Sequence, residues 1–216
     1  MTAPDLDQRE RHELCDLLDE LGPDRPTLCE GWTTSALAAH LAVRERQPLA
    51  APGILMGGPF ASTTERLMNR ELERHGYQGT VEHVRRGPPP GPLRIPAVRY
   101  RVNLIEMTVH HEDVRRANGE RARTDRPDLD DAIWDMLGSG LRLFLLRGRI
   151  RGMRVELHRP GGDVHAAGRP DAAEVVLSGP PVECLLYLQG RKGATEATVT
   201  GDDRAVEIFE AASFAI

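Results

Sequence analysis

The hydrophobic pattern of this 216-residue chain changes near Gly152, and the change limits the folds that it can form. Before Gly152, apolar residues recur at the three- and four-residue spacing of amphipathic helices. After it, short apolar runs separated by Gly/Pro turns are typical of strands. Residues 1–150 are therefore expected to be all-helical, and residues 151–216 to form a small α+β domain.

Glycine and proline residues set the expected ends of the individual elements. A Gly/Pro-rich connector at residues 87–92 cannot be helical inside. Helices are expected over residues 6–21, from Thr33 or Thr34 through Arg44, from Thr63 or Thr64 to a stop at Gly76, and over residues 97–118 and 130–146. In the second part we expect strands at residues 153–158, 164–167, 174–177 and 197–200, a helix from Pro181 that stops at Gly190, and a helix at residues 202–212. The predicted fold class is mostly α.

Charge and hydrophobicity argue against two classes of partner. The chain carries 28 Lys and Arg residues against 33 Asp and Glu, a net charge of -5 at pH 7, whereas nucleic-acid-binding proteins usually show a basic excess. The longest uncharged run, residues 47–64, is interrupted by three prolines and three glycines, which a transmembrane helix of about 20 apolar residues would not contain. We expect this run to be a loop, and the protein to bind neither nucleic acid nor a membrane.

The cysteines indicate the compartment. Cys15, Cys29 and Cys184 are an odd number at wide spacing, so a disulfide framework is not expected and a reducing environment fits better. The first fifteen residues are charged and lack the apolar stretch of a signal peptide. The sequence therefore predicts a cytoplasmic protein.

One pattern in the sequence is typical of a metal site. Glu106 and His110 are four residues apart, so on a helix their side chains are neighbours, and they continue an apolar row. A carboxylate that points into a core is costly unless it is paired or bound to a metal. His40 lies between Leu37 and Leu41, toward the apolar face of another predicted helix. Two histidines and one glutamate from two helices would form a His₂Glu site with one open position, a ligand set that catalytic zinc uses.

Each of these residues also has a simpler interpretation. Glu106 and His110 alone fit an ordinary surface pair, and His40 alone fits a histidine at the edge of a core. Cys29 fits either a fourth ligand or redox thiol, or a buried structural cysteine. His111 lies about 100° around the helix from His110, so at most one of the two faces the ion easily. The sequence does not show whether His40 meets the other two residues in space.

Two segments of the chain resemble a known family. The run Pro-Thr-Leu-Cys-Glu-Gly-Trp-Thr-Thr-Ser-Ala-Leu-Ala-Ala-His-Leu-Ala, which ends at Ala42, is followed at a distance by Glu106-xxx-His110-xx-Asp113. Together they resemble the mycothiol-dependent maleylpyruvate isomerase family of the DinB-like superfamily of metal-binding four-helix bundles. The Thr-Leu-Cys-Glu-Gly-Trp form is similar to an actinobacterial subgroup whose activity is undefined. Gly190-Arg191 after an apolar helix resembles the sterol-carrier-protein-like domain that such proteins often append, so the resemblance covers nearly the whole chain.

The resemblance implies a role for individual residues. It places the metal triad on His40, Glu106 and His110, with zinc or another divalent metal as the ion. It places a residue that orients a ligand, or packs the helix, on Asp113. In the C-terminal domain it implies an arginine that helps to hold an anionic substrate, for which Arg191 is the candidate.

The activity that the resemblance implies depends on the low-molecular-weight thiol mycothiol. A zinc-coordinated thiol is deprotonated and can attack a small electrophilic substrate. Addition to a double bond, rotation and elimination would make an isomerase, whereas attack that ends at the conjugate would make a transferase. Two alternatives stay open: a thiol-independent metallohydrolase, and a non-catalytic metal- or ligand-binding protein. A monomer or a homodimer is expected.

Overall fold

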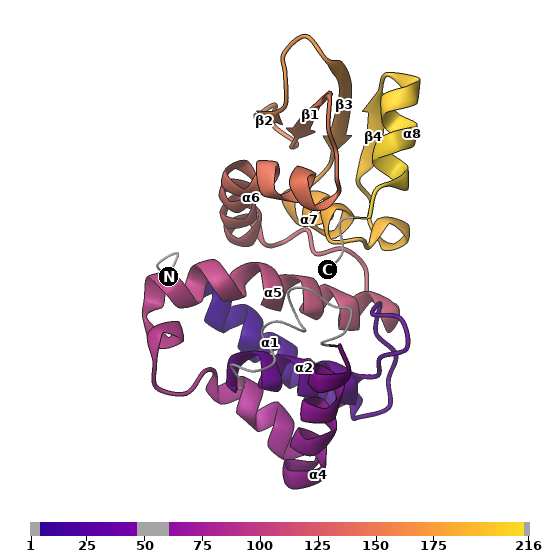
Figure 1. Cartoon of the computed structure of the whole chain (residues 1–216). Coiled ribbons are helices and arrows are strands. Elements are labelled where there is room, and N and C mark those ends of the chain that lie inside the picture. Colours follow the sequence, from indigo (N-terminus) through magenta and orange to yellow (C-terminus); the bar gives the residue numbers. More distant parts are fainter. Residues whose placement is uncertain (1–4, 47–60, 214–216) are drawn as a thin grey trace. The chain divides into compact units, whose positions relative to one another are not determined.

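The computed structural model describes residues 5–46 and 61–213 (Figure 1). Contacts between Cα atoms divide the chain into two compact units that meet in the sequence between Ala122 and Arg123. Secondary structure in the described part is mostly helical, with one small sheet in the second unit. This confirms the predicted mostly α class and the change of pattern after Gly152.

The first unit is built from helices that pack around an aliphatic core (Figure 1). Its elements are α1 (Leu6–Leu21), α2 (Thr34–Arg46), α4 (Ala61–Arg86), the 3₁₀ turn η4 (Pro92–Arg94) and α5 (Pro96–Ala117). Helix α2 packs against α4, while α1 packs against α5 and α4. The bounds of α1 and α2 confirm the predictions, and α5 ends just before Asn118 and Gly119, as the glycine stop indicated.

Helix α4 differs from the prediction at both ends. Residues 47–60, most of the expected loop, lie outside the described residues, but residues 61–64 already belong to α4. The expected stop at Gly76 is confirmed as a break in the helix, but a second helical segment that was not predicted follows directly. Gly76 has φ 63° and ψ 178°, which breaks the helix, yet the chain re-enters helical geometry at Tyr77 and continues to Arg86. Glycine takes this positive φ without the steric cost that a Cβ brings, so it bends the path here and does not end it.

The second unit combines α6 (Pro127–Arg147) with a sheet and two shorter helices (Figure 1). The strands β1 (Met153–His158), β2 (Val164–Ala167), β3 (Ala173–Ser178) and β4 (Thr198–Gly201) are ordered β2-β1-β3-β4. Strands β1 and β3 are parallel, and the two outer pairs are antiparallel. Helix α7 (Pro181–Leu188) and the turn η5 (Lys192–Ala194) precede β4, and α8 (Asp203–Ala211) packs on β3 and β4. The predicted strands are confirmed to within a residue at each end.

The division between the units differs from the boundary expected at residue 150. Helix α6 groups with the second unit because it packs against α7 and β2. The ring of Trp134 on α6 stacks on His165 of β2 with centroids 4.3 Å apart. Gly138 allows this approach, since a Cβ there would lie 2.4 Å from the His165 ring. The periodicity of α6 showed that it has an apolar face, but not which part of the chain covers that face.

Within the described residues, no helix combines the length and the apolar composition that crossing a membrane requires. Cys15, Cys29 and Cys184 are all free cysteines, as their spacing predicted. Burial raises the pKa of Cys15 and of Cys184 to about 12, so these two thiols stay protonated near neutral pH.

Candidate metal centre

The three residues of the predicted triad lie together in the first unit. Helix α2 carries His40, and α5 carries Glu106 and His110 one turn apart. One ligand atom from each of the three lies within 4.8 Å of the other two. The Oε1 of Glu106 is 3.2 Å from Nε2 of His40 and 3.4 Å from Nε2 of His110. The structure thus brings these three donors together. The sequence alone assigned them to two separate helices and did not show that they meet.

Packing of α2 positions His40. Leu37 and Leu41, which flank it, are fully buried in the core. The ring of Trp32, just before α2, lies 5.0 Å from the His40 ring between centroids, and the His110 ring lies 5.2 Å away on another side. Between these neighbours, Nε2 of His40 lies 3.2 Å from Oε1 of Glu106.

Arg44 is a site residue that sequence reasoning missed. Its Nε lies 3.1 Å from Oε1 of Glu106, and its Nη1 donates to Oδ1 of Asn103 at 2.9 Å. The signal was present, because Arg44 follows His40 by four residues on the same helix and therefore lies on the same face. The guanidinium partly neutralises the carboxylate that a metal would also use.

The pKa values of the three groups are shifted in different directions. Burial raises the pKa of Glu106, but hydrogen bonds with His110 and His40 and the charge of Arg44 outweigh it and hold that pKa well below its ordinary value. Burial lowers the pKa of His110, but hydrogen bonds with Asp113, Cys29 and Glu106 raise it well above its ordinary value. Burial dominates at His40 and lowers its pKa. The protein environment therefore favours an ionised Glu106 beside a neutral His40.

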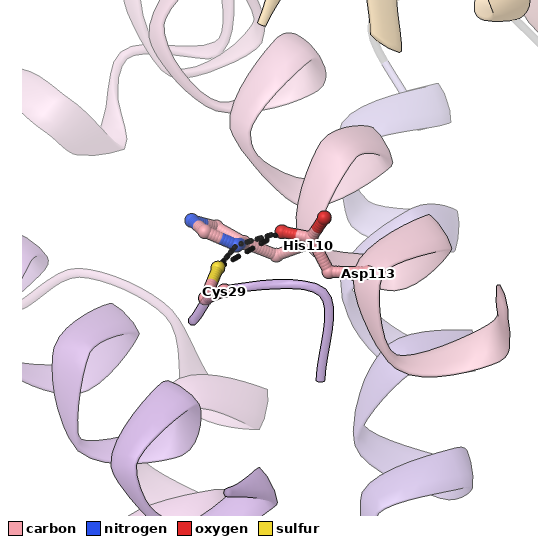
Figure 2. A group of neighbouring side chains, drawn as sticks. All are labelled: Cys29, His110 and Asp113. Carbon is pink, nitrogen blue, oxygen red and sulfur yellow. Dashed lines mark hydrogen bonds and ion pairs between the residues drawn. The ribbon is translucent and has the colours of Figure 1, made fainter. Parts of the chain in front are cut away.

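The Nδ1 edge of the His110 ring contacts a carboxylate and a thiol. Figure 2 shows Cys29 and Asp113 approaching the same ring nitrogen of His110. Its Nδ1 is 2.9 Å from Oδ2 of Asp113 and 3.9 Å from Sγ of Cys29, and that sulfur lies 3.2 Å from the same carboxylate oxygen. A carboxylate that accepts from Nδ1 fixes the tautomer that leaves Nε2 free to bind a metal. Asp113 is therefore suited to orient His110 toward Glu106 and His40.

Cys29 lies on the side of His110 away from Glu106. It contacts Nδ1, whereas Glu106 is closest to Nε2. The loop that carries it is anchored to α5, since the Leu28 amide donates to the backbone oxygen of Asp113 at 3.1 Å. This position fits a hydrogen-bonding partner of Asp113 better than a fourth ligand beside Glu106.

Two further predicted residues lie elsewhere. His111 is buried, and its Nδ1 is 3.1 Å from Oε2 of Glu10 on α1, so His110 alone of the pair faces the triad, as the helical geometry predicted. Arg191 belongs to the second unit, where its Nη1 donates to the backbone oxygen of Gln189 at 2.5 Å. Its role toward an anionic substrate stays a prediction.

Replacing Asp113 by asparagine tests its orienting role. We expect Asp113→Asn to weaken zinc binding at the triad by about 10- to 100-fold, as for other residues that orient a metal-bound histidine. The pKa of His110 in the metal-free protein should fall as well, because the hydrogen bond with Asp113 helps to raise it. Chelator competition measures the first effect and NMR titration of the imidazole the second. Asp16→Asn, at an exposed carboxylate of α1, should change neither; an unchanged zinc affinity in Asp113→Asn would contradict the assignment.

Comparison with known proteins shows likeness in fold but not in sequence. No family model matches the chain, and no curated protein resembles it closely in sequence. A solved structure of mycothiol-dependent maleylpyruvate isomerase is 18% identical, with a TM-score of 0.57 over 92% of this chain and 91% of that one. A histidine-to-alanine mutant of that enzyme is 17% identical, with a TM-score of 0.58 over 91% of each chain. The resemblance found in the sequence is thus confirmed at the level of the fold, which this chain shares with mycothiol-dependent maleylpyruvate isomerase.

Proposed function

We propose that the chain is a metal-dependent enzyme related to mycothiol-dependent maleylpyruvate isomerase, which uses mycothiol to isomerise a small electrophilic substrate. The observation that carries this proposal is the meeting of His40, Glu106 and His110 from two helices within that fold. Transfer of the thiol to the substrate uses the same three residues and is the closest variant of the reaction. The free cysteines support a reducing, cytoplasmic setting.

The triad fits a divalent metal by the chemistry of its donors. Two imidazole nitrogens and one carboxylate oxygen are a ligand set used by catalytic zinc, with one position left for a water or a substrate. Histidines 40 and 110 are each only 8% exposed, and the carboxylate between them is held ionised. A half-buried anion beside two buried nitrogen donors matches a cation bound from three sides. We infer that zinc, or a divalent metal of similar preference, binds here.

The neighbouring residues would keep the donors ready for such an ion. Asp113 accepts from Nδ1 of His110, so Nε2 of that ring stays directed toward Glu106 and would bind a metal once its proton is lost. Arg44 holds the Glu106 carboxylate in place and in its ionised form. Burial keeps His40 neutral, which is the form that donates a lone pair. When bound, zinc would supply a Lewis acid that lowers the pKa of a coordinating thiol.

The position of Cys29 supports catalysis over the non-catalytic alternative. A purely structural zinc site is closed by a fourth protein ligand. Cys29 was the candidate for that ligand, and it lies at Nδ1 of His110 where it contacts Asp113. Among the described residues, the group around Glu106 then supplies three ligands, and a fourth position left to a water or a thiol would favour an enzyme. Arg191 is proposed to help to hold the anionic group of the substrate.

Binding of mycothiol to the zinc-loaded protein tests the proposed function. We expect mycothiol at 100 times its dissociation constant to stabilise the protein by about 2.7 kcal/mol, seen as a rise in thermal midpoint. S-methylated mycothiol, which cannot form a thiolate, is the matched control and should raise the midpoint much less. Zinc- and mycothiol-dependent loss of maleylpyruvate, followed by absorbance, would then establish isomerisation. A wild-type protein whose midpoint does not respond to mycothiol would contradict the proposal.

A further inference from the structure

A second cluster of metal-ligating side chains lies on α4, apart from the triad. Glu71 and His75 come from the segment before the break at Gly76, and His83 comes from the segment after it. One ligand atom from each lies within 4.8 Å of the other two. The Oε1 of Glu71 is 2.5 Å from Nδ1 of His83, and the His75 and His83 rings meet edge to face with centroids 4.4 Å apart.

Two glycines let the backbone form this cluster. Gly76 has a positive φ of 63°, which turns the second segment of α4 back toward the first. A Cβ at position 79 would lie 3.1 Å from Cβ of His75, so glycine there leaves room for the histidine to lie close against the second segment. The hydroxyl of Thr80 donates to the backbone oxygen of Gly76 at 2.7 Å and holds the break in its bent geometry.

The cluster has the same residue types and the same helical spacing as the triad. Glu71 and His75 are four residues apart on one helical segment, as Glu106 and His110 are, and a second segment supplies the other histidine in both cases. The ligand set is again two imidazole nitrogens and one carboxylate oxygen. Imidazole and carboxylate together suit zinc and similar divalent transition metals.

The electrostatics leave a place for a cation. Glu71 is 8% exposed, and its ion-pair partner among the described residues is His83. A buried carboxylate is costly unless it is paired or bound to a metal, so a cation held at this position would stabilise Glu71. His75 is exposed, so an ion could reach these donors from solvent.

We propose that Glu71, His75 and His83 form a second divalent-metal site, which clamps the two segments of α4 together across Gly76. The site does not depend on the triad or on the proposed function. Bound metal joins residues on both sides of the break, so it stabilises the bent form of α4. The solvent-exposed ligand makes the ion exchangeable.

Metal titration of an untagged protein tests the site. In a Glu106→Gln background, which disables the triad, Co²⁺ should still bind with one ion per chain and give the visible absorption of nitrogen- and oxygen-coordinated cobalt. Adding His75→Ala should weaken this binding by about 10- to 100-fold or more, since it removes a direct ligand and not only a residue that orients one. His75 is exposed, so the substitution should leave the fold intact. His12→Ala, at an exposed histidine of α1, is the matched control and should bind cobalt like the parent.

The clamp itself has a separate readout. Zinc should slow amide hydrogen exchange in residues 77–86 of the Glu106→Gln protein, and His75→Ala should abolish that protection. Absence of a cobalt spectrum in the Glu106→Gln background, or a spectrum that survives both His75→Ala and His83→Gln, would overturn the proposal. The mycothiol response is measured at the triad in an otherwise unaltered protein, so failure of one proposal is distinguishable from failure of the other.

Discussion

Replacing Glu45 by leucine is expected to lower the free energy of unfolding by about 3–5 kcal/mol. Glu45 on α2 and Arg11 on α1 form an ion pair whose side chains are 2% and 0% exposed. Arg11 also donates from Nη1 to the backbone oxygen of Val84 on α4 at 2.6 Å, and Asn103 of α5 donates to Oε1 of Glu45 at 2.8 Å. Removing the carboxylate leaves the guanidinium buried without its countercharge, and this uncompensated charge is the main cost. Urea denaturation followed by circular dichroism measures the loss.

A double variant separates the two possible causes of that loss. Arg11→Met with Glu45→Leu removes both charges, so it should recover most of the stability that Glu45→Leu loses. An exposed ion pair is the matched control. The side chains of Asp171 and Arg169 are 71% and 77% exposed. Asp171→Ala breaks their contact and should change the free energy of unfolding by less than about 1 kcal/mol. A double variant as unstable as the single one would show that lost packing, and not buried charge, causes the effect.

His110→Ala should remove zinc from the triad almost completely. The change deletes a ligand itself, so the affinity should fall by more than the roughly 10- to 100-fold expected for a residue that only orients a ligand. A His75→Ala background confines the measurement to the triad. Chelator competition gives the affinity, and the metal content of dialysed protein gives the stoichiometry. His12→Ala serves as the exposed-histidine control, and retention of one tightly bound zinc in His110→Ala would contradict the assignment.

The pH dependence of zinc binding has a definite sign. Zinc binds the neutral form of histidine, so a proton on His110 competes with the metal. The pKa of His110 is raised well above its ordinary value of 6.5 through its bonds with Asp113, Cys29 and Glu106, although burial alone would lower it. Affinity should therefore decrease as pH falls, and the decrease should begin above pH 6.5. In Asp113→Asn the midpoint of this decrease should shift to lower pH.

Much of the helical framework could be predicted because its signals are local. The ends of α1 depend on an apolar period and on the Gly22-Pro23 stop, and both are present in the sequence. Glu106 and His110 are close because a helix sets their separation, whatever surrounds it. The same argument would have found Glu71 and His75, but the predicted stop at Gly76 removed His83 from consideration as a helical residue.

Other features depend on tertiary contacts that no local pattern carries. The proximity of His40 to α5 follows from the packing of α2, which buries almost every side of that helix and leaves its apolar face uninformative. Position in the sequence did not indicate that Cys29 meets Asp113, 84 residues away. The grouping of α6 with the second unit was not visible in the sequence because α6 is helical like the first unit, while its partners, α7 and β2, lie further along the chain.

Asn103 joins two parts of the molecule that serve different purposes. Its amide nitrogen donates to Glu45, which pairs with Arg11, and its amide oxygen accepts from Arg44, which pairs with Glu106. One side chain thus connects the ion pair in the core with the carboxylate of the metal triad. A substitution at Asn103 is therefore expected to change both the stability of the fold and the affinity of the triad for a metal.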